Sequence, residues 1–371
     1  MAPIWSKQPF KAAYIAFALL IKIPVLLVLS PRFLFPTFRP LRTLTFRITL
    51  FARLVREYIL FQAQTRSNEK SAVEASQSKA KDRFAKAQTG DATLYTDILE
   101  ATPVIKPAEV GGLWYPGPPP PSADLKDEKV VLHFPGGAFV IACGSDLNGR
   151  MFSPFALKDL KASRLFLAQY RVAEDPSTRF PAALQDLVTF YNYILSLGYR
   201  PCNILVSGDS AAGNLTIGLV RYLEQTAVLS LPAGAMLWSP WTHVTKAAGQ
   251  DYLQEANAHA DILAPEILQW GADAYLPENG PSKEAVPYVS PLHHPFRTTV
   301  PFFIHSGKAE GFCDTIRAFA QEMSNVEGNR VRLHETDLGP HNTAFSHLAT
   351  GLTAAIQRAF EDARDFFDDQ A

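Results

Sequence analysis

The sequence predicts an α/β fold with a mostly parallel central sheet and helices on both of its faces. Two observations support this prediction. Short apolar runs alternate with longer helical segments, as they do where parallel strands are joined by helices. The 371 residues are 47% apolar and 19% charged, enough to bury one large core. The runs that we assign to strands are 130–132, 165–167, 204–206, 235–237 and 302–304.

We expect three parts along the chain: a membrane-anchor segment over 1–35, a helical cap and linker over 36–102, and the α/β domain over 103–371. The first part contains an almost wholly apolar stretch, AAYIAFALLIKIPVLLVLS, at 12–30. As a helix this stretch would be roughly 28 Å long, close to the hydrocarbon thickness of a bilayer. We therefore expect membrane lipid as a partner.

Two residues in the middle of this stretch leave other interpretations open. Lys22 is a charge that is costly in a bilayer and Pro24 removes a backbone hydrogen bond, so a kinked or interfacial helix is an alternative to a spanning one. An uncleaved hydrophobic cap helix is another. No cleavage site of small residues follows the stretch, which favours a retained anchor over a removed signal peptide.

Basic residues are more numerous after the apolar stretch than before it. Lys7 and Lys11 precede it and six arginines follow it, and such an excess marks the cytosolic side of a membrane. We expect attachment to the endoplasmic reticulum, with the side of the α/β domain left open. Apolar residues at helical spacing over 43–65 predict an amphipathic helix that lies on the membrane or covers an active site. The arginines are Arg32, Arg39, Arg42, Arg47, Arg53 and Arg56.

The composition argues against a nucleic-acid partner and against a metal site. Lys and Arg number 35 against 36 Asp and Glu, so no net field attracts nucleic acid. Cys143, Cys202 and Cys313 are scattered without metal-ligand spacing and cannot form the paired framework of a small secreted domain. We expect neither a cofactor nor a metal ion.

The strongest signal for chemistry is the segment 204–214, ILVSGDSAAGN, in which an apolar strand runs into a glycine-flanked serine and then a helical pattern. This pattern is typical of a nucleophile elbow, with Ser210 exposed on a sharp turn. Gly208 and Gly213 supply room for close backbone approach, and the following helix directs its N-terminal dipole at Ser210. An ordinary glycine turn is the alternative, which the strand and helix context disfavours.

A second glycine turn follows the strand at 130–134. In the sequence HFPGGAF, Gly136 and Gly137 offer bare backbone amides, which together with the amide of Ala211 would surround a developing oxyanion. Such donors contribute roughly 3 kcal/mol each to a transition state. A tight turn that needs glycine only for its dihedral angles is the alternative.

Together these motifs resemble the hormone-sensitive-lipase-like family of α/β hydrolases, which includes the arylacetamide-deacetylase-like esterases. The resemblance covers about two-thirds of the chain, from about Val130 to the C-terminus, and implies an α/β-hydrolase fold with an N-terminal helical cap. Further blocks in the family's order are YRVAE at 170–174, FPAA at 180–183, WSPW at 238–241 and YVSPL at 288–292.

The oxyanion turn departs from the family's usual H-G-G-G. Pro135 stands where the family has histidine, and Ala138 replaces the third glycine. The resemblance implies that the first two glycines, kept as Gly136 and Gly137, are the donors. His133 lies two residues early, inside a predicted strand, and we expect a structural role for it.

An activated serine needs a histidine placed after a late strand and an acid between the two in the chain. His341, in the loop LGPHN after the predicted strand 331–336, occupies the place of the family's catalytic histidine. Glu310 lies in GKAEGFCD, which resembles the family's G-x-x-D/E-x-L-x-D, where the first acid is catalytic. Asp314 matches the second acid and is the runner-up, with helix capping as its alternative role. We expect ordinary packing or exposure for the remaining histidines, His243, His259, His293, His294, His305, His334 and His347.

The resemblance implies a serine carboxylic-ester hydrolase that acts on a small hydrophobic ester, with a short acyl group, through Ser210, His341 and Glu310. An acyltransferase or cyclase, or a deacetylase in a natural-product pathway, would use the same groups. A ligand receptor on the same fold is a further alternative, because plant gibberellin receptors resemble this family but lack the histidine. The presence of His341 favours an enzyme over a receptor or an inert membrane scaffold.

Overall fold

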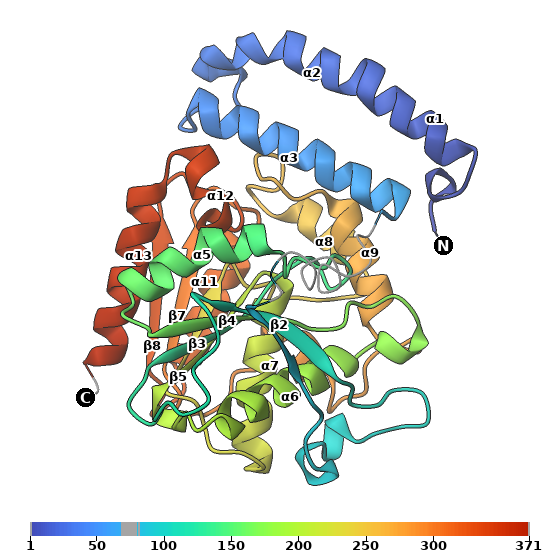
Figure 1. Ribbon diagram of the computed structural model, residues 1–371. Coiled ribbons are helices and arrows are strands. Elements are labelled where there is room, and N and C mark those ends of the chain that lie inside the picture. The colour runs from blue at the N-terminus through green and yellow to red at the C-terminus, as the bar shows by residue number, and fades with distance from the viewer. Residues whose placement is uncertain (1, 68–79, 81, 370–371) are drawn as a thin grey trace.

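The computed structural model describes residues 2–67, 80 and 82–369 (Figure 1). An eight-stranded sheet forms its centre, in the order β1-β2-β4-β3-β5-β6-β7-β8. β2 is antiparallel to both of its neighbours, and the other pairs are parallel. The strands are β1 (Phe84–Ala87), β2 (Val110–Tyr115), β3 (Val130–Phe134), β4 (Arg164–Gln169), β5 (Ile204–Asp209), β6 (Gly234–Trp238), β7 (Phe302–Gly307) and β8 (Val331–Thr336).

Every apolar run assigned to a strand lies within one, so the predicted mostly parallel sheet is confirmed. Successive residues of β3 pack into different cores, because side chains alternate across a strand. Val130 and Leu132 belong to a core on one face with helices α6 (Ala182–Ser196), α7 (Ala211–Thr226) and α11 (Cys313–Ser324). Val131 belongs to a core on the other face with α5 (Asp146–Lys158) and α13 (Thr353–Asp368). Burial on both faces explains why these strands appear as continuous apolar runs.

The helices cover the two faces and one end of the sheet. The connections β3–β4, β4–β5, β5–β6 and β7–β8 each contain one long helix that packs on a face, and α13 follows the last strand. The longer connection between β6 and β7, residues 239–301, contains α8, α9 and α10, and we call it the β6–β7 insert. The helices of the α/β domain are α5 (Asp146–Lys158), α6 (Ala182–Ser196), α7 (Ala211–Thr226), α8 (Ala248–Gln254), α9 (Pro265–Tyr275), α10 (Val286–Val289), α11 (Cys313–Ser324), α12 (Thr343–Thr350) and α13 (Thr353–Asp368).

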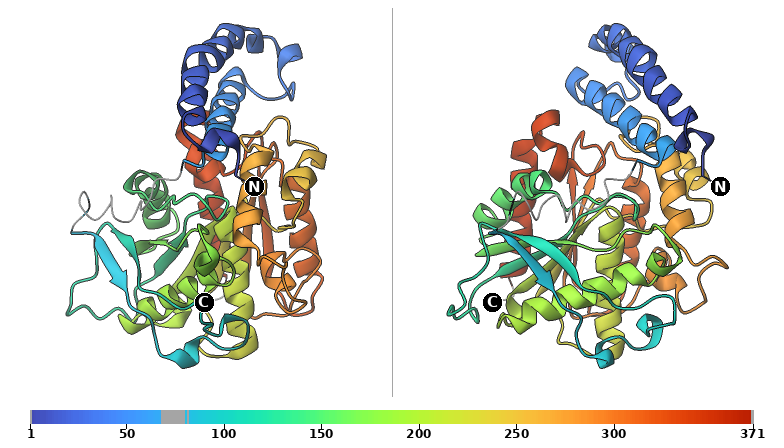
Figure 2. Two further views of the ribbon diagram at one scale, coloured as in Figure 1. Left: turned by 90° about the vertical axis from the view of Figure 1, so that its right-hand side faces the viewer. Right: turned by 45° about the vertical axis from the view of Figure 1, so that its right-hand side comes forward.

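The N-terminal residues form a helical hairpin that stands beyond the sheet, next to the β6–β7 insert (Figures 1 and 2). Its first arm is nearly continuous, and its second arm is α3, which contacts α9 and α12. The hairpin consists of α1 (Phe10–Phe17), a π-helical turn (Ala18–Lys22), α2 (Ile23–Leu29) and α3 (Phe46–Thr65). The remaining short helical turns are Ile4–Ser6, Ser30–Leu34, Pro36–Phe38, Ala92–Leu94, Asp97–Leu99, Pro176–Thr178 and Pro201–Asn203.

The first arm contains the helix expected at 12–30, and Phe10–Leu34 is long and apolar enough to cross a bilayer. Pro24 does not end this helix. It lies in the first turn of α2, directly after the π-helical turn, where the backbone hydrogen-bond pattern changes and the missing N–H of proline is tolerated. Lys22 forms an ion pair of 2.5 Å with Glu57 of α3. The mid-helix charge therefore has a partner on the second arm.

The sheet begins earlier than expected. β1 lies inside the region 36–102, which was expected to be only cap and linker, and pairs with β2 through Phe84 to Ala87. This edge strand is short and its sequence, FAKA, has no apolar run, so its pattern gave no signal. The division of the chain into three parts otherwise stays a prediction.

Candidate active site

Ser210 lies on a strained turn between β5 and α7. Its φ of 53° and ψ of −119° are unfavourable for a residue with a side chain, and they aim the side chain away from the strand. A Cβ atom on Gly208 would lie 2.3 Å from the carbonyl oxygen of Ala212, and one on Gly213 would lie 2.8 Å from Cβ of Pro240. The turn therefore requires glycine at both positions, as expected for an elbow.

The side chains of Ser210, His341 and Glu310 form one hydrogen-bonded line. Nε2 of His341 lies 2.9 Å from Oγ of Ser210, and Nδ1 lies 2.8 Å from Oε2 of Glu310. The serine follows β5, the glutamate follows β7 and the histidine follows β8. The three side chains therefore come from loops at the carboxyl ends of parallel strands. All three side chains are buried, with Glu310 fully so.

The structure does not bring the runner-up acid to the histidine. Asp314 lies in the first turn of α11 and forms an ion pair of 3.1 Å with Arg317. Glu310 therefore is the acid that contacts His341.

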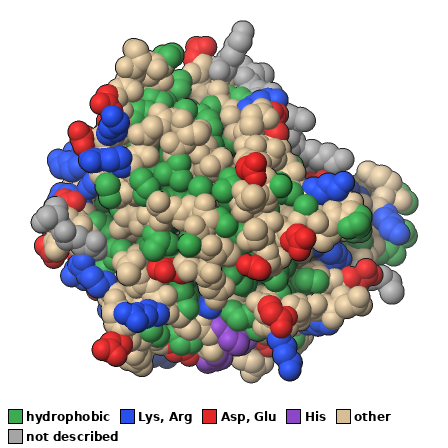
Figure 3. Space-filling view, turned by 90° about the horizontal axis from the view of Figure 1, so that it is seen from below, with side chains coloured by type: hydrophobic (Ala, Val, Ile, Leu, Met, Phe, Trp, Pro, Cys, Tyr) green, Lys and Arg blue, Asp and Glu red, His purple; other side chains and the backbone are tan. Residues whose placement is uncertain are grey.

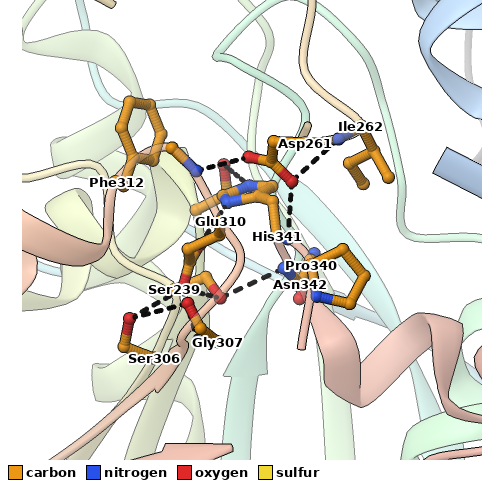
Figure 4. Close-up of polar contacts among 12 residues, drawn as sticks. Ser239, Asp261, Ile262, Ser306, Gly307, Glu310, Phe312, Pro340, His341 and Asn342 are labelled. Atoms are coloured by element: carbon orange, nitrogen blue, oxygen red, sulfur yellow. Dashed lines mark hydrogen bonds and ion pairs between the residues drawn. The ribbon is translucent and has the colours of Figure 1, made fainter. Parts of the chain in front are cut away.

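The second oxygen of Glu310 is held by three donors (Figure 4). Oε1 accepts hydrogen bonds from Oγ of Ser306 (2.9 Å), Oγ of Ser239 (3.0 Å) and the backbone N–H of Gly307 (2.7 Å). Burial raises the pKa of Glu310, whereas these bonds act in the opposite direction by favouring the ionised carboxylate, and they fix its orientation toward His341. Ser239 and Ser306 were not predicted, although Ser239 lies in the WSPW block.

The oxyanion turn differs from the expectation at one residue. Gly136 was expected to donate to the oxyanion, but its backbone N–H donates to Oδ1 of Asp209 (3.0 Å) and is therefore already engaged. The turn lies so close to the elbow that there is no room for a side chain at Gly136. A Cβ atom there would lie 2.4 Å from Oδ2 of Asp209 and 3.0 Å from Cβ of Ser210.

The next two residues line the cavity beside Ser210. Gly137 has a φ of +117°, and a Cβ there would lie 2.0 Å from the carbonyl oxygen of Ile141, so this position requires glycine. In the described part of the chain, the backbone N–H groups of Gly137 and Ala138, and that of Ala211 at the start of α7, have no hydrogen-bond partner. The available donors are therefore Gly137, Ala138 and Ala211 in place of Gly136, Gly137 and Ala211.

Asp209 and His133 support this turn from inside the sheet. Asp209 lies 3.3 Å from Nε2 of His133, and its Oδ2 accepts from the side-chain amide of Asn342 (2.5 Å). Nδ1 of His133 lies 2.9 Å from Oγ of Ser207, and its ring stacks on Phe152. His133 is fully buried, and these contacts are those of a structural residue.

A cavity of about 150 Å³ opens onto Ser210 and His341. Helix α3 contributes Ile59 and Gln62 to its wall, so the helix expected at 43–65 covers the site. Most of the remaining wall is apolar. The other lining residues are Gly137, Ala138, Ile141, Cys143, Ile262, Leu263, Ile267, Leu268 and Asn342.

The charges around His341 favour its protonated form. Burial lowers the pKa of His341, but the hydrogen bond and charge of Glu310, together with the charges of Asp261 and Asp209, raise the pKa above the ordinary value for histidine. An imidazolium at this position, within hydrogen-bond distance of Ser210, is therefore stabilised by the surrounding carboxylates.

Among the described residues, no group of three or more His, Cys, Asp or Glu side chains is arranged to hold a metal ion. Cys202 and Cys313 are free thiols.

A family model described as "alpha/beta hydrolase fold" matches residues 131–345, which is more than half of the chain. The chain belongs to this α/β-hydrolase family. The family and fold expected from the sequence motifs are thereby confirmed. This α/β hydrolase is 31% identical to an acetyl-hydrolase of Streptomyces hygroscopicus over 53% of this chain and 62% of that protein. It is 27% identical to an esterase of Acinetobacter venetianus over 57% of this chain and 66% of that protein.

Solved structures share the fold of this α/β hydrolase. An esterase from the bacterial hormone-sensitive lipase family has a TM-score of 0.60 at 23% identity, covering 86% of this chain and 98% of that chain. The hyperthermophilic esterase of Pyrobaculum calidifontis has a TM-score of 0.59 at 15% identity, covering 87% of this chain and 93% of that chain. The hydrolase spans slightly less than two-thirds of the length of the two curated relatives above.

The contact between Glu310 and His341 predicts a specific pH dependence for ester hydrolysis. If His341 accepts the serine proton it must be neutral, so kcat/KM should fall as the pH decreases through a pKa above the ordinary value for histidine. Replacing Glu310 by Gln removes the charge that raises this pKa, and we expect a lower midpoint and a kcat reduced by roughly 10³ to 10⁴. Rates with p-nitrophenyl acetate across the pH range measure both effects.

The matched control is Asp314→Asn, which alters the surface pair with Arg317. We expect this variant to keep the rate and the midpoint of the unsubstituted enzyme. The assignment of Glu310 is wrong if Asp314→Asn, and not Glu310→Gln, shows the loss.

Proposed function

We propose that this α/β hydrolase is a serine carboxylic-ester hydrolase with Ser210, His341 and Glu310 as its catalytic triad. The hydrogen-bonded line of these three side chains carries the proposal, together with the cavity beside it and its backbone donors, which have no partner among the described residues. The relatives named acetyl-hydrolase and esterase support the same reaction class.

The geometry supports a two-step mechanism. His341 Nε2 takes the proton of Ser210 while Oγ bonds to the ester carbonyl carbon, and the carbonyl electrons move onto oxygen. The N–H groups of Gly137, Ala138 and Ala211 stabilise that oxyanion. The carbon–oxygen bond to the alcohol then breaks, and His341 gives its proton to the departing alcohol. Water, deprotonated by His341, attacks the acyl-enzyme and releases the carboxylic acid and Ser210.

The cavity favours a short acyl group on a hydrophobic ester. Its volume of about 150 Å³ leaves little room beside Ser210, and its wall is formed by side chains such as Ile141, Leu263 and Leu268. Apolar walls of this kind exclude water and retain apolar groups. A deacetylase is one member of this substrate class.

Acyl transfer or cyclisation would use the same three groups with an alcohol of the substrate in place of water. A ligand receptor on this fold would not need the 2.9 Å contact between His341 and Ser210. That contact is the observation that favours an enzyme.

A series of p-nitrophenyl esters of increasing acyl length tests the substrate class. We expect the highest kcat/KM for acetate to butyrate and a fall of at least about tenfold at octanoate, because longer chains do not fit the cavity. We expect Ser210→Ala and His341→Ala to lose about 10⁴-fold or more in kcat. A maximum at long chains would contradict the short-acyl assignment, and turnover retained by Ser210→Ala would contradict the triad.

We also propose that the N-terminal hairpin attaches the enzyme to a membrane. Its first arm exposes large apolar side chains, with Leu20 at 75% and Val28 at 76% exposure. The opposite end of the molecule carries Lys, Arg, Asp and Glu side chains spread among each other (Figure 3). An interfacial helix buries such an apolar face among lipid headgroups and acyl chains.

Contacts between the two arms favour a retained segment over a cleaved signal. Tyr14 stacks on Phe61 of α3 at a centroid distance of 6.0 Å, and Lys22 pairs with Glu57. Removal of the first arm would expose the apolar side of α3. Attachment to the endoplasmic reticulum in particular stays a prediction, and the side of the membrane on which the α/β domain lies stays open.

Flotation with phosphatidylcholine vesicles tests the attachment. We expect the full chain to float with the vesicles and the double variant Leu20→Glu, Val28→Glu to remain in the soluble fraction, because each charge would enter the acyl region. Val104→Glu is the matched control, since Val104 is 56% exposed but lies outside the hairpin. Equal flotation of all three proteins would contradict attachment through this arm.

A further inference from the structure

A second buried carboxylate, Asp261, lies beside the triad and is not explained by the mechanism. It belongs to the β6–β7 insert, between α8 and α9, and is 1% exposed. Figure 4 shows its two oxygens directed at the loops around the triad.

Asp261 accepts four hydrogen bonds. Oδ1 accepts from the backbone N–H groups of His341 (2.8 Å) and Ile262 (2.8 Å). Oδ2 accepts from the backbone N–H of Gly311 (2.9 Å) and the hydroxyl of Tyr252 (3.0 Å). One carboxylate thus binds the main chain at the histidine and at the residue that follows Glu310.

The two loops touch directly near the strand ends, where the N–H groups of Lys308 and Ala309 donate to the carbonyl oxygens of Thr336 and Gly339 (2.9 Å each), and Asp261 adds a link farther out, at Gly311 and His341. The strands fix the positions of residues 307 and 336, but His341 lies five residues beyond the end of β8 and Glu310 lies three beyond the end of β7. The Glu310 carboxylate orients the imidazole, whereas Asp261 fixes the backbone that carries the imidazole.

The segment that carries Asp261 is itself held by the N-terminal hairpin. The guanidinium of Arg56, on α3, donates to the carbonyl oxygens of Ala258 (2.7 Å), Asp261 (3.3 Å) and Leu263 (2.5 Å). Since α3 also forms part of the cavity wall, the same helix covers the substrate and braces the insert.

We propose that Asp261 is a positioning residue that holds the His341 and Gly311 backbones in the geometry required by the triad, with Arg56 holding its segment in place. The inference rests on the proposed hydrolase function. Asp261 touches neither substrate nor the reacting atoms, so it acts through His341 and Glu310.

Because Asp261 is charged, its replacement should change the pH profile of hydrolysis, whereas replacing a residue with only a structural role should not. The charged or titratable groups near Asp261 are Arg56 from α3, Tyr252 from α8, Glu310 after β7 and His341 after β8, and Asp209 at the end of β5 also acts on His341. Loss of its negative charge removes one of the interactions that raise the pKa of His341. The acidic limb of the pH profile should therefore move to lower pH.

Asp261→Asn in the full chain, assayed with p-nitrophenyl acetate, tests the inference. We expect kcat to fall about a hundredfold with KM changed less than about threefold, the cost of a misplaced catalytic group. We also expect the midpoint of the acidic limb to decrease. Asp186→Asn is the matched control, because Asp186 is fully buried and binds the N–H and guanidinium of Arg171 away from the site. It should lower Tm but keep kcat and the pH midpoint.

A folded Asp261→Asn enzyme with unchanged kcat overturns the inference, as does one whose only change is a lower Tm. If Asp261→Asn does not fold, Arg56→Met is the second test of the inference. A lower kcat with an unchanged KM in this variant supports positioning through the segment that Arg56 holds. An unchanged kcat overturns the inference. If the unsubstituted enzyme shows no hydrolysis that depends on Ser210, the proposed hydrolase function is wrong. Failure of the proposed function can therefore be distinguished from failure of the inference on Asp261.

Discussion

The imidazole of His341 can bridge Ser210 and Glu310 only if three loops are held to within about 0.5 Å of one geometry. The parallel strands bring these loops to a common edge, but they do not by themselves set the distances. Those distances depend on the strained elbow at Ser210, on the three donors to Glu310 and on the bonds that Asp261 makes to the main chain.

The elbow and the oxyanion turn depend on each other. Gly136 packs on Asp209 and Ser210 so closely that a single Cβ atom would not fit, and its N–H binds the Asp209 carboxylate. This contact fixes the next two residues with their N–H groups unpaired in the described structure. The replacement of the family's third glycine by Ala138 is therefore compatible with donation, since a donor needs only its backbone amide.

Local patterns account for what the sequence predicts correctly. Apolar runs reveal β3 to β7 because both of their faces are buried, and the glycines around Ser210 reflect a steric requirement within a few residues. His341 and Glu310 were found through family motifs at the ends of β8 and β7. The contacts that local patterns do not contain were missed or misassigned. Asp261 reaches His341 across 80 residues, and Gly136 reaches Asp209 across 73, so neither pairing leaves a signal in the neighbouring sequence.

Labelling with a fluorophosphonate, followed by peptide mass spectrometry, tests the central claim most directly, because the probe reacts only with a serine that a neighbouring base activates. The account predicts one adduct per chain, on Ser210, which is lost in Ser210→Ala and kept when the exposed Ser196 is replaced by Ala. No adduct on the folded enzyme, or an adduct on another serine, would contradict the account.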